Sequence, residues 1–290
     1  MITYSRMLFK NELNSNRMHY LLRYGEIALK GANRKDFEAV LKRNIGRHLK
    51  QQDVTGKITR IPGRFLVECS SEVSFRPVFG LVSASKVEVV EMNMDSMNEL
   101  ALKLSLLHKA KTFRVDANRL DKRCTLESMQ VNKEVGAYLV EKTGMKVQLK
   151  GSELTVGIEL LPEKAFLYVE TEACLGGLPV GSQGKIGALI EDEQSVLAMV
   201  LVMRRGSAVI PFMKKQLALG VVQQYAPYDV QPVLLDGRDV SEVLGEEDVD
   251  VLVVNDVGAD VREELSGITL LRPLVGCNKK ELAQLKKVYL

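Results

Sequence analysis

The sequence predicts an α/β protein built from three modules, with an α+β first half. Between His19 and Met92 the expected elements follow the order strand, helix, strand, strand, helix, strand, which is the ferredoxin-like motif. Leu178–Phe212 contain a strand, a tight turn, a helix and a second strand, which together form a βαβ unit. The 290 residues are 46% hydrophobic and 27% charged, which suits a globular chain of about two domains or three small ones.

The first module is expected at residues 18–92, after a loosely held extension at 1–17. Asn33, followed by Asp36 three residues later, predicts a capped helix start. Apolar residues then recur at helical spacing from Phe37 to Leu49. The other elements expected here are a strand at His19–Tyr24, a hairpin of 57–61 and 64–69 across Pro62-Gly63, a short helix near Ser74–Leu81, and a strand at Lys86–Met92.

The second module is expected at residues 93–172 and the third at 186–290, with a glycine-rich linker at 173–185 between them. In the second module we expect helices at Ser96–His108 and Thr125–Lys142, and strands at 112–116, 146–149, 153–160 and 165–170. In the third module we expect strands at 208–212, 231–235, 250–254 and 268–271, and a last helix that Asn278 and Glu281 cap.

Charge is distributed unevenly along the chain. Met1–Val90 carry a net charge of +8, 91–172 carry −1, and 173–290 carry −4. A polyanion would therefore meet the front of the chain. The candidate contacts are the basic residues of the first two modules: Lys30, Arg34, Lys35, Lys42, Arg43, Arg47, Arg114, Arg119, Lys122, Arg123 and Lys150. The alternative is that these side chains only solvate a helix face.

Other site classes have little support in the sequence. The four cysteines lie far apart without a C-x-x-C pair, and the three histidines are scattered, so we expect neither a metal site nor a disulfide framework. No apolar run approaches the ~20 residues of a membrane helix, and the first ten residues lack the apolar core of a secretory signal. We therefore expect a cytoplasmic protein without a membrane partner.

Several ordered motifs resemble the tRNA 4-thiouridine synthetases, the ThiI family. The resemblance begins at Arg23-Tyr24-Gly25-Glu26-Ile27-Ala28-Leu29-Lys30-Gly31 and continues through Phe113-Arg114-Val115, Gly176-Gly177-Leu178-Pro179-Val180-Gly181 and Arg272-Pro273-Leu274-Val275-Gly276. It implies a ferredoxin-like domain, a THUMP domain and a truncated Rossmann-like domain of the PP-loop type. In that family the first two domains bind tRNA and the third adenylates the target uridine.

The sequence departs from the family where a nucleotide would bind. The family's PP-loop reads Ser-Gly-Gly-x-Asp-Ser, and those positions hold Ile190, Glu191, Asp192, Glu193, Gln194 and Ser195. Phosphate needs bare backbone N–H groups, whereas carboxylates in the first turn would occupy the positive end of the helix dipole themselves. The stretch that carries the family's catalytic cysteine is missing or shortened, and we expect no rhodanese-like domain.

Three hypotheses follow. The first is a tRNA-binding protein without its own adenylation or sulfur transfer, which has no catalytic residues and no cofactor. It would hold the acceptor end of tRNA across the first two domains, with a homodimer through the C-terminal domain and a modification enzyme as possible partners. The alternative is an active ATP-dependent tRNA sulfurtransferase. A third reading, an interaction module with no role in RNA binding, leaves the basic front unexplained.

Overall fold

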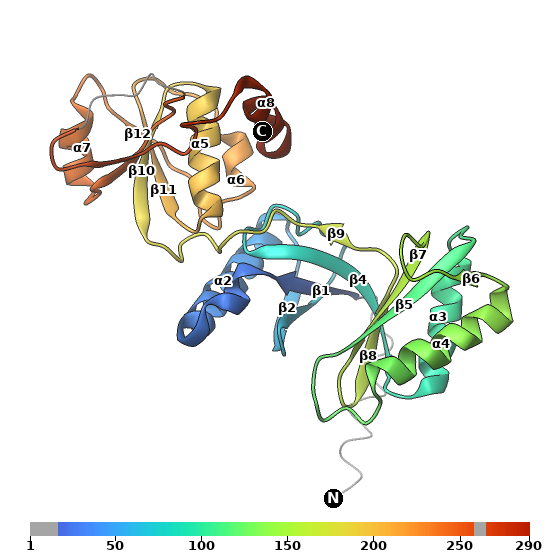
Figure 1. Cartoon of the computed structure of the whole chain (residues 1–290). Helices are drawn as coiled ribbons and strands as arrows, with labels where there is room; N and C mark the ends of the chain where they lie inside the picture. The colour runs from blue at the N-terminus through green and yellow to red at the C-terminus, as the bar shows by residue number, and fades with distance from the viewer. Residues whose placement is uncertain (1–16, 258–264) are drawn as a thin grey trace, which may run out of the picture. The chain divides into compact units, whose positions relative to one another are not determined.

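The computed structural model describes residues 17–257 and 265–290 (Figure 1). The described residues form two compact units. One contains the residues up to Arg23, Asp53–Val73 and Ala84–Glu172. The other contains Tyr24–Gln52, Ser74–Ser83 and the residues from Ala173 onward. The predicted extension lies outside the described residues except for Arg17. The predicted domain boundaries remain predictions.

One large sheet runs through both N-terminal modules in the order β2-β3-β1-β4-β8-β7-β5-β6, and β9 pairs with β4. The first four strands reproduce the spatial order of a ferredoxin-like sheet, which confirms the predicted fold class. The strands are β1 (Met18–Tyr24), β2 (Gly56–Ile61), β3 (Arg64–Cys69), β4 (Leu81–Glu91), β5 (Thr112–Arg119), β6 (Lys146–Val147), β7 (Leu154–Leu160), β8 (Lys164–Tyr168) and β9 (Glu172–Ala173).

The helix predicted near Ser74–Leu81 is wrong, because the structure has turns there and β4 begins at Leu81. Pro77 explains the difference. Proline lacks an N–H group and disfavours helical backbone at the preceding residue, so a helix of eight residues with proline at its centre is not stable. Phe75 and Phe79 are nevertheless buried, so the apolar spacing reflects a packed turn.

The second module packs two helices on one face of the sheet. These are α3 (Met94–Leu106) and α4 (Ser128–Thr143). They cover a core that includes Phe113, Val135 and Ile158. β4 extends from the strands of the first module into this sheet and pairs with β8, as Figure 1 shows. The two N-terminal modules therefore share one continuous strand.

In the other unit, α2 (Arg34–Gln51) follows two 3₁₀ turns, η1 (Glu26–Leu29) and η2 (Gly31–Asn33). Asn33 occupies the N-cap position, but its side chain accepts no capping hydrogen bond, so the predicted side-chain cap is wrong. The physical reason is the backbone at Asn33, which is helical (φ −81°, ψ −2°). Side-chain capping needs an extended N-cap residue, and the preceding turn prevents that.

The C-terminal residues form a parallel sheet in the order β12-β11-β10-β13-β14, as expected for a Rossmann-like domain. Its strands are β10 (Lys185–Ile190), β11 (Ala208–Met213), β12 (Val233–Leu234), β13 (Val251–Val253) and β14 (Thr269–Leu271). Its helices are α5 (Glu193–Arg204), α6 (Gly220–Gln223), α7 (Val240–Glu246) and α8 (Lys279–Tyr289). Asn278 and Glu281 form the predicted capping box of α8.

The segment predicted as a linker is tightly held. Gly177 has φ +79°, and a Cβ atom there would lie 2.3 Å from the carbonyl oxygen of Arg204, so only glycine fits. The N–H group of Leu178 donates to that same oxygen over 2.9 Å. The glycines therefore let this segment approach the end of α5 closely.

Candidate nucleic-acid interface and nucleotide loop

Helix α2 presents the basic face that the sequence predicts. Leu41, Ile45 and Leu49 are buried on one side of the helix. Lys35, Lys42, Arg43 and Arg47 are exposed on the other. The amphipathic pattern thus places a cluster of cations in solvent, where a polyanion could reach them.

Some of the predicted contacts already have partners within the chain. The Nη1 atom of Arg47 donates to the carbonyl oxygen of Pro227 over 3.0 Å. The ammonium of Lys30 lies 5.0 Å from the ring centroid of Phe37. Lys35, Lys42 and Arg43 therefore remain the candidates on α2 most available to a phosphate.

Arg34 belongs to a polar cluster at the start of α2. Its Nε atom donates to Glu38 over 2.7 Å and its Nη2 atom donates to the Tyr24 hydroxyl over 2.8 Å. The Tyr24 hydroxyl donates to the same Glu38 carboxylate over 2.5 Å. The hydrogen bonds to Tyr24 and Glu38 raise the pKa of Arg34. Burial, and then the bond to Glu38, raise the pKa of Tyr24, so it stays a neutral donor. This cluster holds the Arg34 guanidinium in one orientation.

In the second module, the structure separates the candidates. Arg119, Lys122 and Arg123 lie at or beyond the end of β5, whereas Lys150 follows β6, which pairs with the beginning of β5. β5 spans about 25 Å, so a single RNA helix could contact the residues at both ends of β5 only if it lay along the strand. Arg114, on β5, donates to Thr155 over 3.1 Å.

Arg123 forms an ion pair with Asp121, 2.6 Å from Nη2 to Oδ2. The side-chain hydrogen bond from Arg123 lowers the pKa of Asp121 to about 2. The pair fixes the turn after β5. All three cations of that turn are exposed, but the described residues show no ion pair for Arg119 or Lys122.

The loop that the sequence predicts as the counterpart of the family's phosphate loop runs from Ile190 to Ser195, from the end of β10 into α5. Asp192 caps α5, since its Oδ1 atom accepts from the Ser195 N–H group over 2.8 Å. In return the Ser195 hydroxyl oxygen accepts from the N–H groups of Glu191 and Asp192, both over 2.9 Å. The N–H groups of Glu191, Asp192 and Ser195 are thus bonded to side chains of the loop itself.

Neighbouring segments also close on this loop. The Nδ2 atom of Asn255, which follows β13, donates to Asp192 over 3.0 Å. Glu193 forms an ion pair with Lys286 of α8. Partial burial raises the pKa of Asp192, but hydrogen bonds from Ser195 and Asn255 outweigh it, and the pKa lies below its ordinary value. Asp192 is therefore an anion at neutral pH, and it caps the N-terminus of α5.

A larger hollow lies at the carboxyl edge of the same sheet. Its volume is ≈ 460 Å³, within the usual range for small-molecule sites. Apolar residues from several strands form most of the lining, and two cationic side chains join them. The lining residues are Leu189, Lys214, Leu235, Gly237, Arg238, Asp239, Val240, Leu252, Val254, Leu265 and Leu270.

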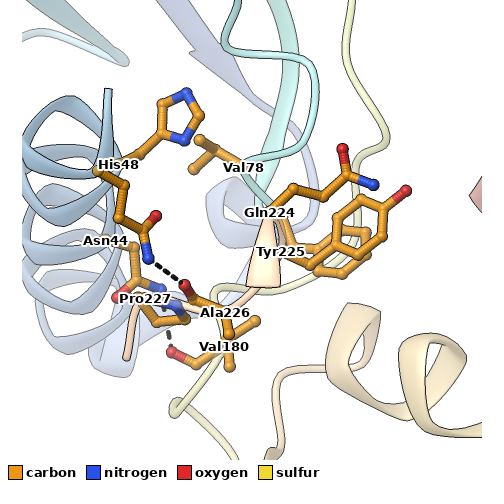
Figure 2. A pocket seen from close by; sticks show the side chains of 10 residues that line it. Asn44, His48, Val78, Val180, Gln224, Tyr225, Ala226 and Pro227 are labelled. Carbon is orange, nitrogen blue, oxygen red and sulfur yellow. Dashed lines mark hydrogen bonds between the residues drawn. The ribbon is translucent and has the colours of Figure 1, made fainter. Parts of the chain in front are cut away.

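Sequence reasoning missed the polar face of α2. Asn44 donates to the carbonyl oxygen of Val180 over 3.0 Å, and Gln51 donates to that of Ala226 over 2.9 Å. The Nε2 atom of His48 lies 2.9 Å from the carbonyl oxygen of Ser74. Asn44 and His48, labelled in Figure 2, and Gln51 line a cavity of only ≈ 10 Å³, which has room for about one water molecule. The i, i+4, i+7 spacing of Asn44, His48 and Gln51 in the sequence is the pattern that could have predicted this polar face of the helix.

Among residues 17–257 and 265–290, no cluster of metal-ligating side chains occurs, and no helix is long and apolar enough to cross a membrane. All four cysteines are free thiols.

Comparison with known proteins identifies the N-terminal modules. Residues 19–85 match the ThiI ferredoxin-like domain and residues 91–170 match the THUMP domain. The chain therefore contains a ThiI-type ferredoxin-like domain followed by a THUMP domain. It is 29% identical to a probable tRNA sulfurtransferase of Methanocaldococcus jannaschii over 95% of this chain and 74% of that protein. It is 36% identical to one of Thermococcus kodakarensis over 66% of this chain and 54% of that protein.

Solved structures extend this likeness over most of the chain. The protein PH1313 from Pyrococcus horikoshii Ot3 superposes with a TM-score of 0.82 at 27% identity, over 93% of this chain and 98% of that chain. A 4-thiouridine synthetase, solved as an RNA complex with bound ATP, superposes with a TM-score of 0.76 at 22% identity over 93% and 84%. The chain spans about half the length of several other tRNA sulfurtransferases that it matches.

Proposed function

We propose that this protein binds tRNA and acts in tRNA modification without its own adenylation or sulfur-transfer activity. The observation that carries the proposal is the loop after β10. The N–H groups of Glu191, Asp192 and Ser195 bond to side chains within the loop. A phosphate would have to displace those bonds and approach the carboxylates of a loop that has no glycine to form a backbone cradle.

The tRNA part of the proposal has independent support. The chain has a THUMP domain, its relatives are named tRNA sulfurtransferases, and a structural neighbour was solved with RNA. Exposed cations on α2 and in the turn after β5 suit a phosphate backbone. Because A-form RNA presents phosphates and 2′-hydroxyls more readily than base edges, we expect recognition of shape, with the acceptor end of tRNA as the bound segment.

The alternative is an active ATP-dependent tRNA sulfurtransferase. The hollow of ≈ 460 Å³ at the carboxyl edge of the C-terminal sheet favours it, because a nucleotide of ordinary size would fit there. Lys214 and Arg238 at its rim could pair with phosphate. Under this alternative the bonds of the 190–195 loop would open when ATP binds.

Two titrations test the proposal. Fluorescence anisotropy of labelled tRNA should show salt-dependent binding, and a thermal-shift series with ATP and Mg²⁺ should show no stabilisation. The matched control is a ThiI-family enzyme that binds ATP, measured in the same buffer. A rise in the unfolding temperature that saturates with ATP would favour the alternative. The absence of tRNA binding at low salt would refute both functions.

A further inference from the structure

A buried ionic cluster lies inside the large N-terminal sheet. Glu159, on β7, is 1% exposed. The Nε and Nη2 atoms of Arg23, on β1, both donate to its Oε1 atom over 3.2 Å. The Nη2 atom of Arg64, at the start of β3, lies 3.7 Å from the same oxygen. One carboxylate therefore neutralises parts of two guanidinium groups.

The surroundings hold Arg23 in one position. Its Nη1 atom donates to the Ser85 hydroxyl over 3.0 Å. Its Cζ atom lies 4.6 Å from the ring centroid of Tyr168. That ring lies over Gly157, where a Cβ atom would come within 2.2 Å of the ring's Cζ atom. Gly157 is thus the residue that lets the ring, and then the guanidinium, stack over the sheet.

The cluster is poorly suited to stabilise the fold alone. The Oε2 atom of Glu159 and the Nε atom of Arg64 are both buried without a hydrogen-bond partner among the described residues. Replacing a buried ion pair by apolar residues is often neutral or stabilising, so such a pair is weak evidence for a role in stability. Its directional bonds, however, allow only one arrangement of the groups they join.

The bonds of the cluster cross from one matched domain to the other. Arg23, Arg64 and Ser85 belong to the ferredoxin-like match, while Glu159 and Tyr168 belong to the THUMP match. An apolar cluster made of residues from both domains lies in the same region: Leu21, Leu66, Val87 and Phe166. Apolar contacts allow the strands of the two domains to shift against each other, whereas the directional ionic contacts fix the orientation and register of these strands.

We infer that Glu159 is a positioning residue that fixes the ferredoxin-like strands β1 and β3 relative to the THUMP domain, and that tRNA binding depends on this fixed arrangement. This inference rests on the proposed tRNA binding. Two domains held rigidly lose less conformational entropy when both bind one RNA. A looser connection therefore lowers the effective concentration of the second domain once the first has bound the RNA.

The first test is Glu159→Gln against the matched control Glu163→Gln, an exposed carboxylate in the β7–β8 turn. Both substitutions remove one negative charge. If Glu159 acted only through its charge, each variant would bind tRNA as tightly as the original chain or slightly more tightly. Positioning predicts that Glu159→Gln alone weakens tRNA binding, by about tenfold. Equal or tighter binding by Glu159→Gln would overturn the inference.

The second test needs no RNA. Spin labels at Lys57→Cys, on β2, and Lys133→Cys, on α4, report the distance between the two domains, with Cys174 and Cys277 replaced by serine. The original chain should give a narrow distance distribution, and Glu159→Gln a broader one. If Glu159→Gln does not fold, Arg23→Lys keeps the charge, loses the paired bonds and should broaden the distribution equally. An unchanged width would refute positioning. A chain that fails to bind tRNA but shows the broadening would refute only the proposed function.

Discussion

Replacing Lys42 and Arg43 by alanine should flatten the salt dependence of tRNA binding. Both side chains are exposed on α2. The described residues give neither of them a hydrogen-bond or ion-pair partner, so the substitutions should leave the fold intact. Arg47 is left out of the variant because its bond to Pro227 makes it part of the structure.

The size of the effect follows from counterion release. Each phosphate contact contributes about 0.7–0.9 to the slope of log K against log salt, so two lost contacts reduce the slope by about 1.4–1.8. Between about 50 and 200 mM salt, the affinity ratio of the original chain to the variant should therefore shrink by roughly tenfold. Anisotropy titrations of two different tRNAs at four salt concentrations measure both quantities, and the loss should be the same for both tRNAs.

The matched control is Lys280→Ala with Lys287→Ala, two exposed lysines of the C-terminal helix. This control also removes two positive charges, but from the acidic third module, so the slope of log K against log salt should not change. If Lys42→Ala with Arg43→Ala binds tRNA with an unchanged slope, the basic face of α2 only solvates the helix, and the reasoning is refuted.

Three further outcomes are expected. Asp192→Ala should lower the free energy of unfolding by about 0.5–2 kcal/mol in chemical denaturation, because the N-cap bond to Ser195 is lost. The pKa of Asp192 is lowered in the folded state, so its contribution to the free energy of unfolding is present above its unfolded pKa and disappears as the pH falls through its folded pKa. An Asp192→Ala variant as stable as the original chain at neutral pH would contradict this. Glu191→Gly with Asp192→Gly should not create ATP binding in a thermal-shift assay, since Gln194 and the shortened cysteine segment remain. Light scattering at tens of micromolar should detect a homodimer through the C-terminal domain, and a monomer there would exclude that self-association.

Much of the fold was predictable because hydrophobic periodicity and turn residues act locally. The order of strands, the hairpin at Pro62-Gly63 and the capping box of α8 all followed from short-range chemistry. The helix near Ser74–Leu81 failed for a local reason as well: Pro77 outweighed the apolar spacing. The cap at Asn33 failed because the 3₁₀ turns before it kept its backbone helical.

The candidate site was less predictable because its bonds join residues far apart in the sequence. The sequence predicts an altered phosphate loop at 190–195, but the Asn255 and Lys286 contacts that close on this loop depend on the folded sheet and helix. Likewise, Asn44, His48 and Gln51 bind carbonyl groups from three separate segments. Glu159 reads as one carboxylate in an alternating strand, and only the paired strands bring Arg23 and Arg64 to it.

The most direct test of the proposed function is a calorimetric titration of ATP and Mg²⁺ into the protein while it is saturated with tRNA. RNA is present in that experiment, so a nucleotide site that forms only in the complex would be detected. The side-chain bonds of the 190–195 loop predict no binding heat up to millimolar ATP. Stoichiometric binding, abolished by substitution of Ser195, would contradict the proposal and establish the ATP-dependent alternative.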